Sequence, residues 1–410
     1  MTIKKQPEDF VVEEVLDEGW RLRVHAAPAP APGPDQFAVY QLFKRSLSTP
    51  AAASLLAAAL GVRRADIAYA GLKDKHGETM QHVTVAAAAP PLPEISGETW
   101  SARLLGYSPE AITSAAIAAN RFRVTVRGLT QQAAHAMTVT ARRLSTGRGS
   151  LKLINYFGRQ RFGSARGGGS GAGGGFLAPL LIRGEFEPAL RLAIAAPHRD
   201  DSKRLKAFKR AMQQHWNDWP AASEATAATR VPERRALQHL LKHPDDFRGA
   251  FRKLPYLFQQ MCIQSYQSLL WNRIAANMIE RQLKPHRYTR VVDKFGDLLF
   301  PHAADIARPW RDLNLPLLAP GTELREPWKQ AAETVLAQEG VTRADLHIPG
   351  AERPWFGEAS RAFVIDVREF QMDPPETDEL AAKGPRFKVA MKFELPRGSY
   401  ATVLLRSLGS

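Results

Sequence analysis

The sequence lacks several features that define whole classes of protein. Its 410 residues include a single cysteine, Cys262, so an internal disulfide and a cysteine-based zinc site are both excluded. The longest apolar run, residues 51–60, is far shorter than the roughly 20 residues that span a bilayer. The charged start of the chain has no apolar stretch of the kind found in secretory signals. We therefore expect a cytoplasmic protein that keeps its thiol reduced and has no membrane segment.

Acidic residues are scarce relative to basic ones. The chain has 41 Asp and Glu against 56 Lys and Arg, which gives a net charge of +15. With 44% hydrophobic and 24% charged residues, it is too apolar to be disordered. Basic proteins commonly bind phosphate polymers, because neutralised phosphates release their counterions. The alternative, that the surplus charge only keeps the surface solvated, stays open from composition alone.

Motifs for metal-dependent or nucleotide-dependent chemistry are also missing. The sequence has no Gly-Lys-Ser/Thr phosphate loop, no G-x-S-x-G elbow and no H-E-x-x-H pair. The glycines of Gly167–Gly175 can be aligned with G-x-G-x-x-G, but the next helix is expected about ten residues later, so we interpret them as a hinge or linker. Cys262 falls on the apolar side of a predicted helix and should be a core residue rather than a nucleophile. We expect neither a metal nor a cofactor.

The residue pattern along the chain predicts a sheet-based domain interrupted by a helical module. Residues 120–126 and 386–395 alternate apolar with polar or basic side chains, which predicts strands with one buried face and one face lined by cations. Thr49, Pro50 and Gly61 have the pattern of an N-cap, a first-turn proline and a helix stop. Other strands are expected at residues 11–15, 37–43, 67–70 and 81–87, and helices at residues 187–195, 203–212 and 254–279.

The segment A-G-L-K-D-K-H-G-E, residues 70–78, places one carboxylate, Asp74, between two lysines. The neighbouring ammonium groups favour its ionised form at neutral pH. An ionised carboxylate there could act as a nucleophile or general base on the sugar of a nucleic acid. The same residues are also good formers of a solvated turn. Spacing alone leaves both interpretations open.

Two further segments have the composition of RNA-binding sites. Residues 153–163, L-I-N-Y-F-G-R-Q-R-F-G, combine aromatic rings for base stacking with arginines for phosphates and glycines for close backbone approach. The alternative is a core strand, but such a strand would not carry Arg, Gln and Arg in succession. Residues 395–402, L-P-R-G-S-Y-A-T, form a Pro/Gly turn that follows a basic strand.

Taken together, these motifs resemble those of the TruD family of tRNA pseudouridine synthases. AGLKDKHGETMQ, INYFGRQRFG and FELPRGSYATVLLR occur in the family's order, with KKQPEDFVVEE before them and NRFRVTVRGL between. The resemblance implies an α/β (α+β) fold, in which a pseudouridine synthase catalytic domain has a mixed, mostly antiparallel sheet. It places that domain in residues 1–180 and 360–410, and an inserted, mostly helical TRUD-type domain in residues 181–359.

The same resemblance implies roles for individual residues. Asp74 matches the catalytic aspartate, and Lys4 is the best match to its basic partner, with the adjacent Lys5 as the alternative. Phe157 matches the aromatic residue expected to stack on or beside the target base. The other residues expected to bind the substrate are Asn155, Lys73, Glu8, Arg161 and Arg397.

The expected activity is the isomerisation of uridine, at position 13 of tRNA, to pseudouridine. The aspartate assists cleavage of the C–N glycosidic bond, the base rotates, and a C–C bond forms; the reaction involves no net redox step and needs no cofactor. tRNA is the expected partner, with the cation-lined strand faces and residues 203–210 along its backbone, and no protein partner is evident. A non-catalytic tRNA-binding or RNA-chaperone protein on the same scaffold is the alternative. An RNA methyltransferase would need a cofactor site that the sequence does not show.

Overall fold

The computed structural model describes residues 2–26, 36–86, 92–147, 149–163, 175–198, 201–382 and 384–409. The chain divides into two compact units: residues 1–153, 302–304 and 365–410 form the first, and residues 154–301 and 305–364 form the second. Most of the predicted hinge, residues 167–174, lies outside the described residues. This division follows contacts in space and does not test the boundaries between the catalytic domain and the inserted domain. The boundaries at residues 180/181 and 359/360 therefore stay a prediction.

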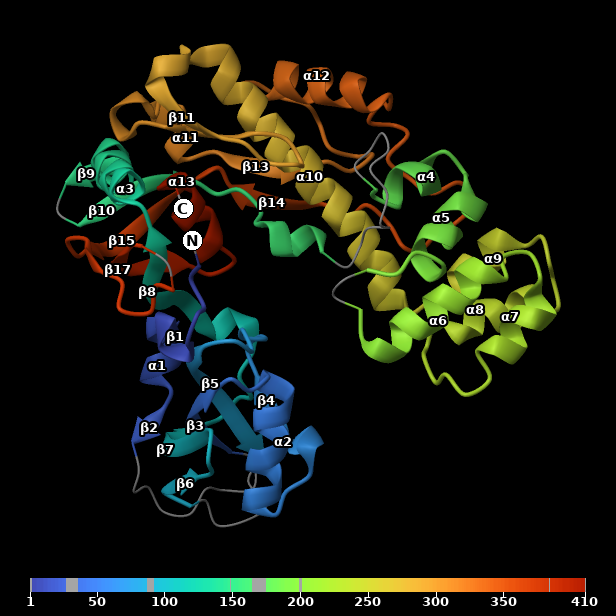
Figure 1. Cartoon of the computed structure of the whole chain (residues 1–410), viewed down its shortest axis with the longest axis horizontal. Helices are drawn as coiled ribbons and strands as arrows, with labels where there is room; N and C mark the ends of the chain where they lie inside the picture. Colours follow the sequence, from blue (N-terminus) through green and yellow to red (C-terminus); the bar gives the residue numbers. More distant parts are fainter. Residues whose placement is uncertain are drawn as a thin grey trace. The chain divides into compact units, whose positions relative to one another are not determined.

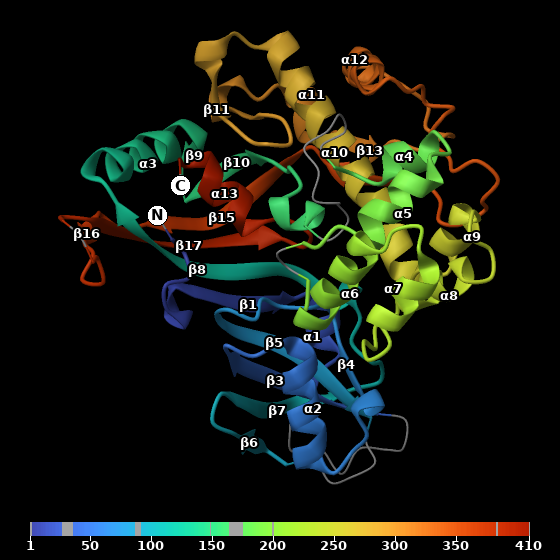
Figure 2. The same cartoon turned by 45° about the vertical axis from the view of Figure 1, so that its right-hand side comes forward.

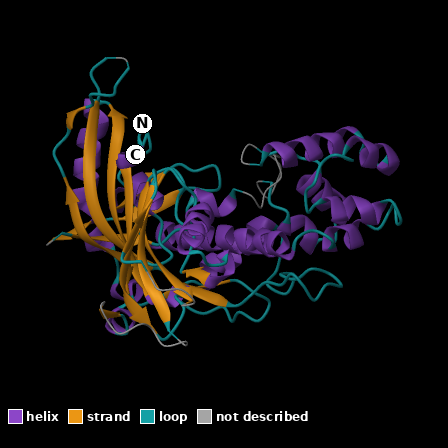
Figure 3. Cartoon of the chain, turned by 90° about the horizontal axis from the view of Figure 1, so that it is seen from below, coloured by secondary structure: helices purple, strands orange, loops and turns teal. Residues whose placement is uncertain are grey.

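The first unit is built on one mixed sheet of thirteen strands (Figure 3). Its strands are β1 (Phe10–Leu16), β2 (His25–Ala26), β3 (Phe37–Arg45), β4 (Ile67–Tyr69), β5 (Glu78–Ala86), β6 (Glu94–Ser96), β7 (Trp100–Ser108), β8 (Ile117–Leu129), β9 (Ser145–Gly147), β10 (Ser150–Ile154), β15 (Val364–Met372), β16 (Glu376–Thr377) and β17 (Phe387–Pro396). The main order is β2-β7-β3-β5-β1-β8-β17-β15-β10-β9. The pairing of β1 with β5 is parallel, whereas β8 pairs antiparallel with both β1 and β17. The predicted mixed, mostly antiparallel sheet is confirmed.

Helices α1 (Glu18–Leu22), α2 (Thr49–Leu60), α3 (Gln131–Leu144) and α13 (Ala401–Ser407) complete the first unit. Figure 2 shows α2 lying across β3 and β5, where its small side chains share one core cluster with residues of those strands. The helix ends at Gly61, whose φ of 68° suits glycine. It begins one residue earlier than predicted, because the Ser48 side chain, rather than that of Thr49, caps it by accepting from the amide of Ala51.

The two faces of the sheet differ in polarity, as the alternation in β8 and β17 predicts. On the buried face Phe122 lies opposite both Val12 and Phe393, and the rings of Phe122 and Phe393 stack with centroids 5.2 Å apart. Arg121 and Arg123 project from the other face.

Carboxylates from neighbouring strands balance much of that cation-lined face. Arg121 lies 3.2 Å from Glu369, 3.4 Å from Glu394 and 3.9 Å from Glu13. The predicted stripe of cations is therefore an interleaved pattern of both signs. Arg123 and Lys392, which lie opposite each other, have no ion-pair partner among the described residues.

The second unit is mostly helical and is organised around the long helix α10 (Figure 1). Its helices are α4 (Ala178–Ile182), α5 (Phe186–Ile194), α6 (Lys203–Gln214), α7 (Trp219–Ala225), α8 (Arg234–Leu240), α9 (Phe247–Arg252), α10 (Tyr256–Gln282), α11 (Arg308–Arg311) and α12 (Lys329–Glu339). Two short ribbons accompany them, β11 (Tyr288–Val291) with β12 (Leu298–Pro301) and β13 (Asn314–Leu317) with β14 (Ala359–Ala362). The helices predicted at residues 187–195, 203–212 and 254–279 are confirmed as α5, α6 and α10. Among the described residues no helix has both the length and the apolar character to cross a bilayer.

Candidate active site

Asp74 lies in the loop that joins β4 to β5 in the first unit. Its Oδ2 atom is 3.1 Å from Nζ of Lys4, and both side chains are partly exposed. The Lys4 ammonium also lies 4.2 Å from the centre of the Phe10 ring, within the range of a cation–π contact. Of the two lysines left open by the sequence, the structure pairs Lys4 with Asp74.

A buried ion network fixes the segment that carries Lys4. Oδ2 of Asp9 accepts hydrogen bonds from the amides of Lys5 and Gln6, each 3.1 Å long. Oδ1 of Asp9 accepts from Nε of Arg127 at 2.8 Å, and Arg127 is only 4% exposed. The backbone directly after Lys4 is therefore tied to strand β8 through Asp9 and Arg127.

Arg127 has further acidic partners that arrive from the far end of the sequence. Its Nη1 lies 2.8 Å from Oδ1 of Asp378 and 3.0 Å from Oε1 of Glu379. Burial would lower the pKa of Arg127, but the hydrogen bonds that it donates to Asp9, Asp378 and Glu379 raise it above its ordinary value. Burial likewise would raise the pKa of Asp378, yet the bond from Arg127 and backbone amides lower it. Arg127 and Asp378 are thus both held in their ionised forms.

Lys73 is directed inward and anchors the Asp74 loop. Its Nζ lies 2.9 Å from Oε1 of the buried Glu14 and 2.6 Å from Oδ1 of Asn120. Its backbone amide donates to the hydroxyl of Thr49 at 3.0 Å, which explains why that hydroxyl does not cap α2. Burial would raise the pKa of Glu14, but hydrogen bonds from His82 and the charge of Lys73 lower it. The ammonium predicted to bind substrate therefore already has two partners within the protein.

The anchors of the loop lie on the buried side of the sheet. Glu14 and Asn120 alternate with Glu13 and Arg121 along β1 and β8, so they point to the opposite face. The cations of Arg121 and its neighbours consequently lie on the other side of the sheet from the loop anchors. This removes the reason to expect that the cation-lined face follows an RNA bound at Asp74.

Lys44 is a member of the Asp74 site that sequence reasoning missed. It is fully buried on β3, and its Nζ donates to the main-chain oxygen of Asp74 at 2.6 Å and to the hydroxyl of Thr79 at 3.3 Å. Burial lowers the pKa of Lys44 to about 8, with the charge of Asp74 opposing the shift and that of Lys73 adding to it. The sequence held one sign of this role. Lys44 lies two residues after Leu42 on β3, so the lysine shares the strand's inward, otherwise apolar face.

We expect Lys44→Met to slow the reaction by about 10- to 100-fold, because the carbonyl of Asp74 loses the group that positions it. The wild-type rate should fall as the pH rises through about 8, where Lys44 loses its proton and its charge. The variant should lack this decline, which a pH profile of kcat/KM measures. Lys75→Met, at the exposed lysine after Asp74, is the matched control with an unchanged profile. A decline that persists in Lys44→Met would contradict the assignment.

Glu8 and Arg397, both predicted to bind substrate, have other partners in the first unit. Glu8 bonds through Oε1 to Nη2 of Arg45. Arg397 donates from Nη1 to the carbonyl of Ser114, and its backbone amide donates to Ala118 at 3.0 Å. Within the described part of the chain, neither side chain forms a hydrogen bond or ion pair with Asp74. Their roles stay predictions.

In the second unit, α10 holds the backbone of the predicted base-stacking residue. The side chain of Asn272 accepts from the amide of Phe157 at 2.8 Å and donates to its carbonyl at 3.0 Å. The Phe157 ring meets Trp271 edge-on, with centroids 5.7 Å apart, and is 8% exposed. The preceding Tyr156 is buried, and its hydroxyl bonds both the amide and the carbonyl of Leu299. Asn272 and Trp271, which are adjacent on α10, therefore set the position and orientation of the Phe157 ring.

Arg361, on β14, joins Asn155 to Phe157 and was not predicted. Its Nε donates to the Asn155 carbonyl and its Nη2 to Asn155 Oδ1, both at 2.6 Å. The guanidinium lies 4.3 Å from the centre of the Phe157 ring. Because a guanidinium has only donors, the amide oxygen of Asn155 must face it. The Nδ2 donor, which has no hydrogen-bond partner among the described residues, is left for another acceptor. Arg361 lies 206 residues from Asn155 along the chain, so no local sequence pattern could indicate this contact.

Arg161 completes this cluster through the same long helix. Its Nε lies 3.3 Å from the hydroxyl of Ser268, and its Nη2 lies 3.0 Å from Oε1 of Gln264. Its guanidinium is 5.9 Å from the Phe157 ring. The structure thus brings Asn155, Phe157 and Arg161 together in the second unit, as it brings Asp74, Lys4 and Lys73 together in the first.

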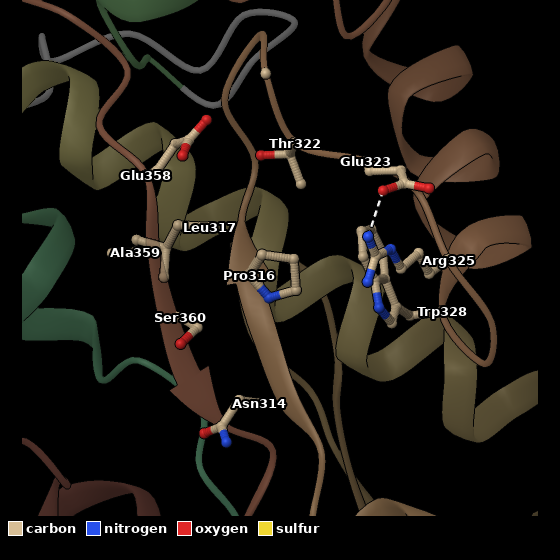
Figure 4. Close-up of a pocket in the computed structure, with 11 residues that line it drawn as sticks. Asn314, Pro316, Leu317, Thr322, Glu323, Arg325, Trp328, Glu358, Ala359 and Ser360 are labelled. Carbon is tan, nitrogen blue, oxygen red and sulfur yellow. Dashed lines mark hydrogen bonds and ion pairs between the residues drawn. The ribbon is translucent and has the colours of Figure 1, made fainter.

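Two hollows lie apart from these groups. One, of about 540 Å³, is lined by both strands of the β13–β14 ribbon (Figure 4). Ser360 lines it, and the next residue, Arg361, points to the other face of the ribbon, so the hollow lies behind the Asn155 cluster. The other, of about 230 Å³, lies on the cation-lined face of the sheet, where Glu13 and Glu369 balance Arg121. The described residues contain no group of His, Cys, Asp and Glu arranged to hold a metal ion.

Comparison with known proteins decides the family. The model of one protein family, described as tRNA pseudouridine synthase D (TruD), matches residues 1–408. The chain belongs to the TruD family. The resemblance inferred from the motifs is confirmed, and the match includes the middle segment that the motifs left uncovered.

Relatives within the TruD family are distant but cover nearly the whole chain. A probable tRNA pseudouridine synthase D 2 of Methanocaldococcus jannaschii is 26% identical over 410 residues, 99% of this chain and 91% of the relative. A tRNA pseudouridine synthase D of Aquifex aeolicus is 28% identical and covers 99% and 97%. The crystal structure of a putative TruD from Methanosarcina mazei has a TM-score of 0.69 at 22% identity, covering 99% of this chain and 92% of that one. The last comparison shows a shared fold.

Proposed function

We propose that this chain isomerises uridine to pseudouridine in tRNA, with Asp74 as the acting carboxylate and position 13 as the expected target. The observation that carries the proposal is the ion pair of Asp74 with Lys4 at the tip of a loop whose backbone is held by Lys44 and Lys73. Membership of the TruD family supports the same activity. A cytoplasmic location is part of the proposal, because it fits the tRNA substrate.

The reaction has simple requirements that the Asp74 site meets. The C1′–N1 bond of uridine breaks, C1′ bonds to C5, the hydrogen on C5 leaves to solvent and N1 gains a proton. An ionised carboxylate at the sugar assists departure of uracil, either by attack or by proton abstraction. Asp74 is exposed enough to reach a sugar, and Lys4 stabilises its charge at 3.1 Å. The balance of atoms needs no cofactor.

Asn155 and Phe157 are proposed to hold the detached uracil. Arg361 orients the Asn155 amide with its NH₂ group away from the guanidinium. A donor so presented pairs with a carbonyl of uracil and is repelled by the exocyclic amine of cytosine. Phe157 supplies the apolar ring against which the base lies, and Arg161 a charge for a phosphate.

Contacts with the tRNA backbone are proposed for helix α6 rather than for the cation-lined strand face. Lys203, Arg204 and Arg210 are exposed on this helix, as a phosphate contact requires. Lys209, by contrast, is buried and lies 3.0 Å from Asp201, so it serves the fold.

Tritium release tests the activity directly. A tRNA transcript labelled with tritium at C5 of its uridines loses label to water when the new bond forms at C5. The wild-type protein should release one tritium per target uridine, and mapping of the product should find pseudouridine at one position. Binding of tRNA without any release would contradict the proposal and favour the non-catalytic alternative.

Phe157→Leu tests the ring of the uracil site. We expect kcat to fall by about 10- to 100-fold while KM changes by less than about 3-fold, because the ring acts on the detached base and not on the bound tRNA. Leucine retains much of the buried volume, so the fold persists where alanine would leave a cavity. Phe208→Leu, at a buried phenylalanine of α6, is the matched control and should keep kcat. An unchanged kcat in Phe157→Leu would exclude the stacking role.

A further inference from the structure

Leu72, two residues before Asp74, is a large apolar side chain held in water. It is 71% exposed, at the tip of the loop that carries the carboxylate. Its neighbours Ala70 and Gly71 have little or no side chain, and Lys75 and His76 are polar. A single exposed leucine is ordinary on a protein surface. Its significance here depends on how the loop holds it.

The two residues after Leu72 are fixed to the sheet and to helix α2 at three points. The amide of Lys73 donates to Thr49, the ammonium of Lys73 lies between Glu14 and Asn120, and the carbonyl of Asp74 accepts from the buried Lys44. Lys73 is directed inward, whereas the residues on either side of it, Leu72 and Asp74, are exposed. These bonds hold the loop directly after Leu72 in the conformation that leaves Leu72 exposed. The loop therefore presents an apolar side chain and a carboxylate together.

An apolar group at this place has a use in the proposed reaction. A uridine in a folded tRNA is stacked, and chemistry at its C1′ and C5 needs the nucleotide turned out of the stack, which costs a few kcal/mol. The gap left behind is lined by the faces of two neighbouring bases. An apolar side chain inserted between base steps fills such a gap and keeps the nucleotide from returning.

We propose that Leu72 is a wedge that enters the base stack of the RNA beside the target uridine and occupies the place of the extruded base. The proposal rests on the proposed function and adds the group that holds the extruded state. Leu72 is two residues from the carboxylate that acts on the same nucleotide, so insertion and chemistry are coupled through one loop that its bonds with Thr49 and Lys44 hold in place.

Leu72→Ala tests the wedge against a control of equal exposure. We expect kcat/KM on folded tRNA to fall by about 10- to 100-fold, matching the unstacking cost that the leucine offsets. Leu22→Ala, at the end of α1, removes a leucine that is also 71% exposed and should change the rate by less than about 2-fold. Both variants should have the same melting temperature as the wild type, because neither side chain is buried. An unchanged rate for Leu72→Ala on folded tRNA overturns the proposal.

A second substrate separates the wedge from a general defect of the loop. In a tRNA whose target uridine is placed in an unpaired bulge, unstacking is already accomplished, so Leu72→Ala should lose less than about 3-fold. Leu72→Phe should retain activity on both substrates, because a ring also fills the gap. An equal loss on both substrates would show that Leu72 only shapes the loop, and would overturn the proposal.

Fluorescence reports the insertion itself, without turnover. With 2-aminopurine next to the target uridine, binding of Asp74→Asn should raise emission as the stack opens, and Leu72→Ala in the same background should bind without this rise. A rise of equal size in both overturns the wedge. Absence of tritium release by the wild-type protein would be a failure of the proposed function, and the fluorescence comparison is independent of that result.

Discussion

Asp74→Asn is expected to bind tRNA with unchanged affinity and to release no tritium from C5-labelled uridine, a loss of about 10³-fold or more. The amide keeps the shape of the side chain and can still accept from Lys4, but it has no charge and no basic oxygen with which to act on the sugar. The ion pair with Lys4 is partly exposed, so its loss should change the free energy of unfolding by less than about 1 kcal/mol.

Asp66→Asn provides the matched control for the carboxylate. Asp66 also belongs to the first unit and forms an ion pair, with Arg63 at 2.8 Å, but lies outside the Asp74 loop. The Asp66→Asn variant should retain full turnover. Tritium release measured on both variants at saturating tRNA decides the matter, and detectable turnover by Asp74→Asn would refute the assignment of the acting group.

Arg127→Met should have the largest effect on stability, a loss of about 3–5 kcal/mol in the free energy of unfolding measured with urea. The substitution leaves Asp9 and Asp378 buried without their cation, and their remaining backbone amides do not replace it. Because Asp9 holds the amides after Lys4, the variant should also turn over more slowly under conditions where it is folded.

Arg121→Met separates the effect of burial on stability from the effect of the number of ion pairs. Arg121 lies on the same strand and also has three carboxylates within 4.0 Å, but its side chain is 44% exposed. Exposed pairs contribute little, so we expect a loss of about 1 kcal/mol or less. Equal losses for the two variants would contradict the view that the Arg127 network is a buried anchor.

Local patterns were sufficient wherever the outcome depended on neighbours in sequence. The period of two in residues 120–126 and 386–395 predicted β8 and β17, and the apolar rhythm of residues 254–279 predicted α10. The Asp74 and Phe157 motifs were found for the same reason, since each is contiguous. Thr49 shows the limit of such reasoning: its sequence is that of a cap, but a tertiary contact with Lys73 takes its hydroxyl, and Ser48 caps the helix.

Residues that act from a distance could not be identified in this way. Arg361 meets Asn155 across about 200 residues, and nothing near Arg361 marks it as a partner of the N-Y-F-G motif. Alternation continued one residue past 120–126 puts Arg127 on the face lined by cations, but it does not reveal the carboxylates that other segments bring to it. Lys44 was detectable in principle, as a charge on the inward side of a strand.

The position of β17 bears on when this protein can first become functional. The strand lies in the interior of the sheet between β8 and β15. In the sequence, the whole second unit lies between β17 and its partner β8. During synthesis on the ribosome the earlier strands must wait with an open edge until β17 emerges, and contacts of such long range form slowly. Asp378, which completes the set around Arg127, emerges equally late. Newly made chains should therefore depend on protection from aggregation until their last strand has been translated.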